Sequence, residues 1–177
     1  IDNLKYGLQE KQDKVSAKLS SISAFTSQTI YELRDTIWAM NKEKISIEDL
    51  QARISNFIDK AGVAYTKVKF TFQVADNISN EFMLPSIKGM NVYRIIQEGV
   101  NNALKYAEAQ SIIVSLSEKD NQFELSILDD GKGFDLKNTE MGNGLNNIKK
   151  RSRDLGGTVY FNSNNKGTKI TLTFPMD

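Results

Sequence analysis

The sequence predicts an α+β protein in which a two-layer α/β sandwich follows a long helix. Seven of the eleven glycines lie between residues 131 and 167, whereas residues 13–41 contain neither glycine nor proline. Residues 67–74 alternate strictly between polar and apolar types, which is typical of a strand with one buried face. The two ends of the chain therefore differ in kind, and we expect a helical arm over residues 1–44 and a compact domain over residues 45–177.

The composition excludes several classes of protein. The 177 residues are 40% hydrophobic and 25% charged, which does not fit disordered, collagen-like or mucin-like chains. The absence of cysteine and histidine excludes disulfides, thiolate metal sites, imidazole bases and a phosphohistidine within this sequence. With 23 basic and 22 acidic residues, the net charge of +1 provides no general attraction to nucleic acid.

The sequence also bears on location. No apolar run approaches the roughly 18 residues that span a bilayer, and no export leader is present, so we expect a cytoplasmic protein. The chain starts at Ile1 rather than methionine, which we take to indicate a fragment of a longer parent. Any membrane attachment would then belong to parts of the parent outside this sequence.

The first expected element is a helix over residues 13–41, with the heptad pattern of a coiled coil. At 1.5 Å per residue it would be about 43 Å long, more than a small domain can cover, so its apolar stripe should meet another helix or a second subunit. We therefore expect a homodimer through this helix. Residues 1–6, which end near Gly7, indicate the last turns of an earlier antiparallel helix. The stripe consists of Val15, Leu19, Ile22, Leu33 and Met40, with Thr26, Thr29 and Thr36 on the same grid and Phe25, Ile30 and Ile37 beside it.

The compact domain should begin with a capped helix. Ser46 is a good N-cap residue and Asp49 follows in the first turn, so we predict a helix from Ile47 to about Ala61. After the strand at 67–74, we expect helices over residues 87–107 and 143–155 packed on one face of a sheet, with the other face uncovered. The remaining strands are predicted at 111–117, 123–128, 158–162 and 168–174, the first two of these joined by a turn at 118–121.

The helix over residues 87–107 carries the first candidate chemistry. Glu98 and Asn102 are one helical turn apart, so their oxygens can jointly reach a hard cation or an activating water. Lys105 lies a further turn along, where it can meet phosphate. The solvated face of an ordinary amphipathic helix is the alternative explanation, because such faces are universal. The complete polar face consists of Arg94, Glu98, Asn101, Asn102 and Lys105.

Three glycine signals follow this helix in the sequence. Residues 129–134, Asp-Asp-Gly-Lys-Gly-Phe, place an acid pair at the end of an apolar strand, although a tight turn is an alternative for this segment alone. Gly142 and Gly144 open the next helix, whose N–H groups suit an anion. Gly167 and Thr168 start the last strand. Each signal alone is weak, but together with the polar helix they form an ordered set that indicates a binding site.

In this order the motifs resemble those of the sensor histidine kinases, whose ATP-binding domain shares the Bergerat fold of gyrase, the ninety-kilodalton heat-shock chaperone and the MutL repair proteins. Residues 94–107 resemble the N box and residues 129–134 the G1 box, while GNGLNNIKKR and GTKITLTF resemble the G2 region and the final strands. The likeness covers nearly all of residues 45–175. Residues 32–40 are similar to the second helix of the dimerisation and phosphoacceptor hairpin in the subfamily with a Gln-Glu N box, similar to nitrate-sensor and LytS-like kinases.

The resemblance implies a role for each matching residue. Asp129 would accept the adenine amino group of ATP, while Gly131 and Gly133 let the loop approach the base. Asn102 would hold Mg²⁺ on the phosphates, with Glu98 either beside it on the metal or orienting a water. Glu98, Asn102 and Lys105 would form the catalytic group. The other implied nucleotide contacts come from Lys105, Gly142, Gly144 and Arg151 at the phosphates, from Tyr106 along the nucleoside, from Leu145, and from Thr168 at the adenine edge through water.

The sequence departs from the family pattern in four places. Asp130 stands where asparagine is common, which adds a negative charge beside the nucleotide. Residues 135–141 form a short lid, and Tyr106 occupies a position that is often histidine in this subfamily. The acceptor histidine belongs on the first hairpin helix and is absent, so this fragment should bind nucleotide without phosphorylating itself.

We therefore expect the ATP-binding catalytic region of a two-component protein-histidine kinase. It would pass the γ-phosphate of magnesium-ATP to a histidine upstream of Ile1, and thence to the receiver domain of a response regulator. An anti-sigma-factor serine kinase of the same superfamily is one alternative, which phosphorylation of a serine substrate would favour. A non-catalytic dimeric adaptor, which would dimerise without binding nucleotide, is another. A nucleic-acid module is the least supported, because the basic cluster near Arg151 is local.

Overall fold

The computed structural model describes residues 42–135 and 142–176, and before them residues 15, 16, 18, 19, 22, 23, 26, 29, 30, 33 and 37. The chain divides into two compact units, Ile1–Asn41 and Lys42–Asp177. The predicted boundary between residues 44 and 45 falls within the first strand of the second unit, β1 (Lys44–Ser46). Within the described residues, no helix has the length and apolar character needed to span a membrane.

The first unit is helical at every position that the structure describes. Four residues of the predicted stripe lie there, and Val15, Leu19, Ile22 and Leu33 are each more than half exposed on the single chain. Large apolar side chains at this exposure are candidates for burial by a partner. The rest of the helix predicted over residues 13–41, and the remnant predicted over residues 1–6, lie outside the described residues.

The second unit is built on a five-stranded sheet in the order β2-β4-β5-β7-β6. β2 runs parallel to β4, and every other neighbouring pair in this sheet is antiparallel. All five strands were predicted from the sequence, with bounds that differ by two residues or fewer. They are β2 (Lys69–Val74), β4 (Ser111–Lys119), β5 (Gln122–Asp129), β6 (Thr158–Asn164) and β7 (Gly167–Pro175).

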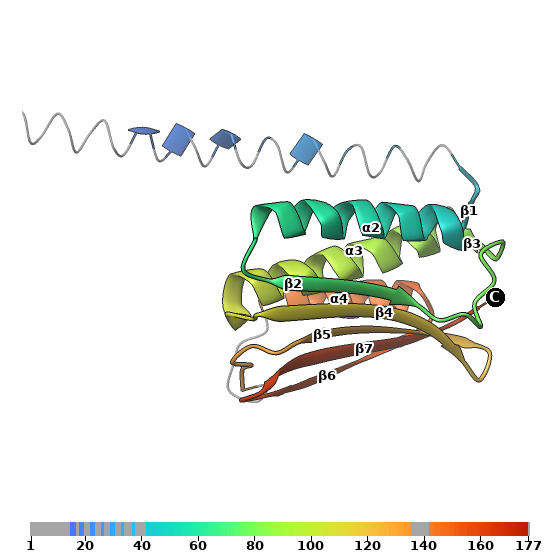
Figure 1. Cartoon of the computed structure of the whole chain (residues 1–177). Coiled ribbons are helices and arrows are strands. Elements are labelled where there is room, and N and C mark those ends of the chain that lie inside the picture. The colour runs from blue at the N-terminus through green and yellow to red at the C-terminus, as the bar shows by residue number, and fades with distance from the viewer. Residues whose placement is uncertain are drawn as a thin grey trace, which may run out of the picture. The chain divides into compact units, whose positions relative to one another are not determined.

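Three helices cover one face of this sheet, as Figure 1 shows: α2 (Ile47–Ala64), α3 (Ser86–Asn102) and α4 (Asn143–Asp154). Within the described residues, no element covers the opposite face. Along β6, Val159 and Phe161 pack towards the core, whereas Tyr160 between them is 64% exposed. The predicted two-layer sandwich with one uncovered sheet face is therefore confirmed.

The helix predicted over residues 87–107 consists of two elements. α3 ends at Asn102, and the chain continues as one π-helical turn, η1 (Ala103–Ala107). In a π turn the backbone hydrogen bonds join residues five apart rather than four, and such turns occur frequently at functional sites. The hydrophobic period of the sequence did not reveal it, because Ala103 and Ala107 are buried as an α-helical projection also requires.

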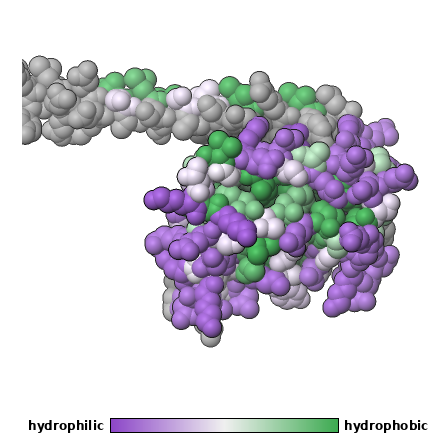
Figure 2. Space-filling view, viewed as in Figure 1, coloured by the Kyte–Doolittle hydropathy of each residue, from purple (hydrophilic) through white to green (hydrophobic). Residues whose placement is uncertain are grey.

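The core lies between the helices and the sheet, and α3 passes close to the middle strands. A Cβ on Gly99 would lie 2.6 Å from Cδ1 of Ile127 in β5, so glycine permits this close approach. Figure 2 shows apolar residues gathered in the middle of the visible face, with hydrophilic residues around them. β2 is an edge strand, and its Phe70 and Phe72 pack against the core while remaining only partly buried.

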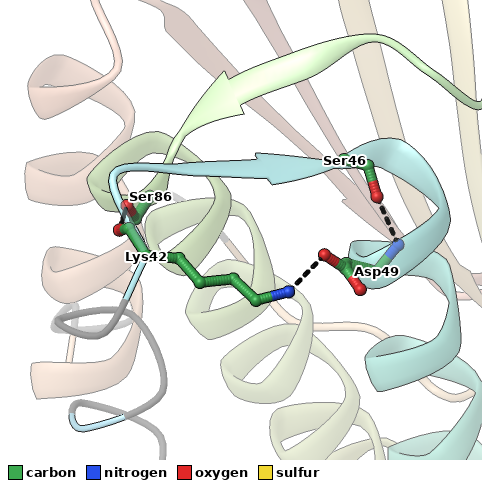
Figure 3. A network of polar contacts seen from close by, with 4 residues as sticks. All are labelled: Lys42, Ser46, Asp49 and Ser86. Atoms are coloured by element: carbon green, nitrogen blue, oxygen red, sulfur yellow. Dashed lines mark hydrogen bonds and ion pairs between the residues drawn. The ribbon is translucent and has the colours of Figure 1, made fainter.

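A short antiparallel ribbon fixes the start of α3. β1 pairs with β3 (Met83–Pro85), and the sequence did not predict this ribbon because three residues are too few to show an alternating pattern. The N–H of Ser86 donates to the Glu43 carbonyl at 3.0 Å, and the Ser86 hydroxyl donates to the Lys42 carbonyl, as Figure 3 shows for the hydroxyl. Lys42 and Glu43, at the start of the second unit, are thus hydrogen-bonded to the start of α3, the helix that carries Glu98 and Asn102.

The start of α2 agrees with the sequence prediction. The N–H of Asp49 donates to Ser46 Oγ at 3.0 Å, which is the hydrogen bond expected of an N-cap. The Asp49 carboxylate also accepts from Lys42 Nζ at 2.6 Å (Figure 3). This ion pair is exposed and adds little stability by itself.

Replacement of Ser46 by alanine should lower the free energy of unfolding by about 1 kcal/mol, because it removes the capping bond. Ser46→Asp keeps an acceptor at the same position and should stay within about 0.5 kcal/mol of the wild type. Urea unfolding followed by circular dichroism measures both variants. An alanine variant as stable as the aspartate variant would contradict the capping role.

Candidate functional site

Asp129 lies at the end of β5, opposite Thr168 in the register of β5 with β7. It is buried, with 6% of its surface exposed. Its Oδ1 accepts hydrogen bonds from the N–H of Gly131 at 2.9 Å and from the N–H of Thr168 at 3.2 Å. These bonds fix the carboxylate between the loop that follows β5 and the start of β7.

Burial raises the pKa of the Asp129 carboxyl above its usual value, because desolvation disfavours the charged form. Hydrogen bonds from Gly131 and Thr168 lower this pKa in part, and the negative charge of Asp130 raises it further. Within the described residues, no lysine or arginine forms an ion pair with Asp129. A buried carboxylate whose partners are neutral donors is a candidate functional group.

The two glycines of the loop after β5 are required by contacts with the chain itself. A Cβ on Gly131 would lie 2.3 Å from the carbonyl oxygen of Ala107. Gly133 has a φ of +60°, and a Cβ there would lie 1.9 Å from the carbonyl oxygen of Asn164. The sequence suggested that both glycines serve the approach of a base, whereas the structure gives each a packing reason. The loop is thereby held between η1 and the turn that joins β6 to β7.

Ser163 joins the same loop to β7, although sequence reasoning did not single it out. Its Oγ accepts from the N–H of Phe134 at 2.8 Å and lies 3.0 Å from Oγ1 of Thr168. Thr168 in turn donates its N–H to Asp129. No local pattern marks Ser163, because Phe134 is 29 residues away in the sequence.

A second cluster lies where α3 meets the start of α4. A Cβ on Gly144 would lie 2.2 Å from Oε1 of Glu98 and 3.1 Å from Nδ2 of Asn102. The carboxylate and the amide therefore converge on the backbone at Gly144, and the structure brings these three predicted residues together.

The donor set of this cluster suits Mg²⁺. Carboxylate and amide oxygens are ligands that Mg²⁺ accepts beside water and phosphate oxygens. Within the described residues, no group of three or more acidic side chains could enclose a metal ion by itself. Glu98 and Asn102 thus fit an ion that is shared with a phosphate ligand.

Lys105 and Tyr106 lie in η1 and are both exposed, Tyr106 to 67%. The π turn begins directly after Asn102, so Lys105 does not continue the α-helical spacing of Glu98 and Asn102. The side chain of Lys105 therefore stands on a separate turn from the Glu98–Asn102 pair, at the end of the helix.

The remaining predicted residues lie in or beside α4. Nη1 of Arg151 donates to Oδ1 of Asn91 at 3.1 Å, and Asn91 precedes Glu98 by seven residues in α3. Seven residues correspond to about 10 Å along the helix axis, so this Arg151 contact lies about two turns before Glu98 in α3. Leu145 is partly buried against the core, and a Cβ on Gly142 would meet no atom of the described residues within 4 Å.

Comparison with known proteins identifies this arrangement. Residues 88–177 match the family described as Histidine kinase-, DNA gyrase B-, and HSP90-like ATPase. An uncharacterized sensor-like histidine kinase of Chloroflexus aurantiacus is 29% identical over 178 residues, and the sensor histidine kinase ComP of Bacillus subtilis is 32% identical over 174. Each comparison covers 96% of this chain, but the chain spans only 30% and 21% of those relatives. A third relative, the sensor histidine kinase LiaS of Bacillus subtilis, is 22% identical, and the chain spans 46% of it.

Solved structures share the fold. The Acinetobacter baumannii histidine kinase AdeS superposes with a TM-score of 0.62 and 16% identity, over 85% of this chain and 78% of that one. The catalytic domain of the histidine kinase ThkA superposes with a TM-score of 0.61 and 15% identity, over 75% of this chain and 95% of that one.

These findings favour the first interpretation of the sequence over the serine-kinase and adaptor alternatives. The family match includes most of α3, the glycine loop, α4 and the strands β5 to β7, and these elements place Asp129, Glu98, Asn102 and Gly144. The chain belongs to the histidine kinase-, DNA gyrase B- and HSP90-like ATPase family, as the ATP-binding catalytic domain of the sensor histidine kinase type.

Proposed function

We propose that the second unit binds magnesium-ATP and transfers its γ-phosphoryl group to a histidine that lies outside this sequence. The bond from the γ-phosphorus to the oxygen that bridges it to the β-phosphate breaks, a phosphorus–nitrogen bond forms, and ADP leaves. The phosphoryl group then passes to an aspartate in the receiver domain of a response regulator. The sensor histidine kinases among the relatives support this proposal, and the lack of histidine in this chain requires an external acceptor.

The buried carboxylate of Asp129 is the observation that carries the proposal. An ionised carboxylate only accepts hydrogen bonds, so it suits the exocyclic amine of adenine and disfavours a carbonyl at the same position. The N–H donors of Gly131 and Thr168 fix its orientation before a ligand arrives. Such a group selects adenine over guanine by hydrogen bonding rather than by shape.

Glu98, Asn102 and Gly144 form the phosphate end of the proposed site. A bound Mg²⁺ would neutralise charge on the phosphates during the transfer. Asn102 supplies an amide oxygen to the ion, and Glu98 either supplies a carboxylate oxygen or orients a water. The N–H groups at the start of α4, next to Gly144, donate to phosphate oxygens.

The other predicted residues complete the proposal. Phosphoryl transfer depends mainly on positioning and charge neutralisation, so no covalent step by the protein is required. Lys105 adds positive charge at the phosphates from η1, and Arg151, whose Nη1 donates to Asn91, adds positive charge from α4. Tyr106, Leu145 and Gly142 contact the nucleotide, and Thr168 reads the adenine edge through water.

We further propose that residues 1–44 are part of a dimerisation hairpin of the Gln-Glu N-box subfamily, on the cytoplasmic side of the parent protein. The exposed stripe of Val15, Leu19, Ile22 and Leu33 supports this. A response regulator is the proposed partner, and any contact with a membrane is assigned to other parts of the parent.

The chain should be a dimer in solution, because burial of this stripe removes apolar surface from water. Light scattering should give about twice the 19.9 kDa mass of one chain. The double variant Leu19→Glu, Leu33→Glu should be monomeric. Ser16→Glu, which changes an exposed residue beside the stripe, should remain dimeric. A wild-type mass near 20 kDa at every usable concentration would overturn the dimer.

Asp129→Asn should weaken magnesium-ATP binding at least about tenfold, because the amide presents N–H donors to the adenine amine. Its oxygen can keep the hydrogen bonds from Gly131 and Thr168. Calorimetric titration with and without magnesium measures the change. Equal affinity of variant and wild type would exclude Asp129 as the adenine acceptor, and no binding by the folded wild type would favour the adaptor function.

The free energy of unfolding of Asp129→Asn serves as the control for the binding experiment. The raised pKa of Asp129 means that the native state holds the proton more tightly than the unfolded state, so Asp129 lowers stability as the pH rises through that pKa. Asp129→Asn should therefore be more stable than the wild type at neutral pH. This gain should vanish as the pH falls well below about 4, where the unfolded carboxyl also becomes protonated. A variant that loses both stability and binding would indicate misfolding.

Gly144→Ala should weaken ATP binding in magnesium by about tenfold or more, because the new methyl group displaces the Glu98 carboxylate from its position beside Asn102. The loss should be much smaller for adenosine, which has no phosphates. Gly62→Ala is the matched control, since the one atom of the described residues within 4 Å of a Cβ there is Cδ2 of Phe70, at 3.8 Å. Equal losses for ATP and adenosine would contradict the phosphate assignment.

A further inference from the structure

The carboxylate of Asp130 is bonded to the chain that follows η1. Its Oδ1 accepts hydrogen bonds from the N–H of Gln110 and from the N–H of Ser111, each at 2.8 Å. The Asp130 N–H also donates to the Ser111 carbonyl at 3.3 Å. The sequence suggested that this residue places its charge beside the nucleotide, whereas in the structure its carboxylate oxygen accepts from two backbone donors.

Further contacts join the same two segments. The N–H of Lys132 donates to the carbonyl of Ala107 at 2.9 Å, and Gly131 packs against that carbonyl. Lys132 Nζ also lies 2.6 Å from the Glu108 carboxylate. This ion pair is exposed and contributes little. Asp130 is therefore the side chain that carries most of the connection between residues 107–111 and the glycine loop.

The geometry of this link explains why it needs an acceptor. Glu108 has a φ of +56°, in the left-handed region, so the chain turns sharply after η1. The N–H groups of Gln110 and Ser111 come directly after this turn, and Asp130 Oδ1 accepts from both. Charge-assisted hydrogen bonds of this kind are stronger than neutral ones. Without these two hydrogen bonds, the segment that joins η1 to β4 would be held less firmly.

We propose that Asp130 is a positioning residue that holds the turn bearing Lys105 in place relative to Asp129, and so couples the adenine end of the site to its phosphate end. This inference rests on the proposed function. Asp130 acts through the backbone at Gln110 and Ser111 and does not itself contact the nucleotide. Asp129 keeps its own bonds from Gly131 and Thr168, so adenine recognition does not depend on Asp130.

The proposed link needs an acceptor oxygen at position 130 rather than a negative charge. A second carboxylate next to buried Asp129 raises the cost of ionising it. An asparagine could supply the same acceptor oxygen without this repulsion. The side chain at position 130 therefore acts through its acceptor geometry, and Asp130→Asn should retain the coupling.

The test compares the affinities of ATP and adenosine in magnesium, by calorimetry, for the wild type and for Asp130→Ala. The ratio of the two affinities should fall by about five- to tenfold in the alanine variant, corresponding to the loss of one or two net hydrogen bonds that position Lys105. Adenosine affinity itself should change little. Asp130→Asn should restore the ratio, and Asp59→Ala, at an exposed aspartate of α2, should leave it unchanged.

A double-mutant cycle with Lys105→Ala shows whether Asp130 acts through this lysine. Lys105→Ala alone should lower the same ratio, and adding Asp130→Ala should lower it little further, because coupled residues are not additive. A residue that only stabilises the fold would give independent, additive losses. Additive losses would therefore overturn the positioning role.

The remaining outcomes are also decisive. An unchanged ratio in folded Asp130→Ala, beside a wild type that binds ATP through Asp129, overturns this inference and leaves the proposed function intact. A wild type that binds no ATP overturns both. If the alanine variant does not fold, Asp130→Glu replaces it, since the added methylene moves the carboxylate away from Gln110 and Ser111. That variant should also lower the ratio, and a wild-type ratio would contradict the proposal.

Discussion

The hydrogen bonds that Asp129 Oδ1 accepts from Gly131 and Thr168 hold together parts of the site that are distant in the sequence. Thr168 lies 39 residues after Asp129, yet the register of β5 with β7 places the two opposite each other. One acceptor atom thereby fixes both the first turn of the glycine loop and the start of the last strand. The carboxylate is buried without a cation among the described residues, so this arrangement raises its pKa and is retained at a cost in stability. A ligand N–H that completes its hydrogen bonding offsets part of that cost.

The rest of the site is arranged around this point by close backbone contacts. Gly131 lets the loop touch the end of η1 at Ala107, and Gly144 lets the start of α4 meet Glu98 and Asn102. A side chain at either glycine would push apart two elements that carry residues of the proposed ATP site. The glycines of these motifs therefore matter for contacts within the protein as well as for space around a ligand. The hydrogen bonds of Ser86 to Lys42 and Glu43 join the chain at the β1–β3 ribbon to α3, which carries the residues proposed to hold the phosphates.

Features that depend on neighbours in the sequence were predictable. The alternation of residues 67–74 gave the edge strand, and Ser46 with Asp49 gave the start of α2. The one-turn spacing of Glu98 and Asn102 gave their proximity, and the ordered motifs gave the family. Features that depend on distant partners were not predictable. The β1–β3 ribbon is too short for a period, the π turn after Asn102 has the same buried alanines as an α-helix, and Asn91 holds Arg151 from 60 residues away. The hydrogen bonds of Asp130 were not predicted for the same reason, because the donors at Gln110 and Ser111 lie 20 and 19 residues away in the sequence.

Recognition of the adenine amine by Asp129 is tested most directly by changing the ligand rather than the protein. Purine riboside triphosphate lacks the 6-amino group and is otherwise equal to ATP. Its affinity for the wild type should be lower than that of ATP by about tenfold or more, because the buried carboxylate then lacks its donor. Inosine triphosphate, which places a carbonyl opposite the carboxylate, should bind more weakly still. With Asp129→Ala the three affinities should converge. Equal affinities of the three triphosphates for the wild type would contradict the assignment of Asp129 as the residue that reads adenine.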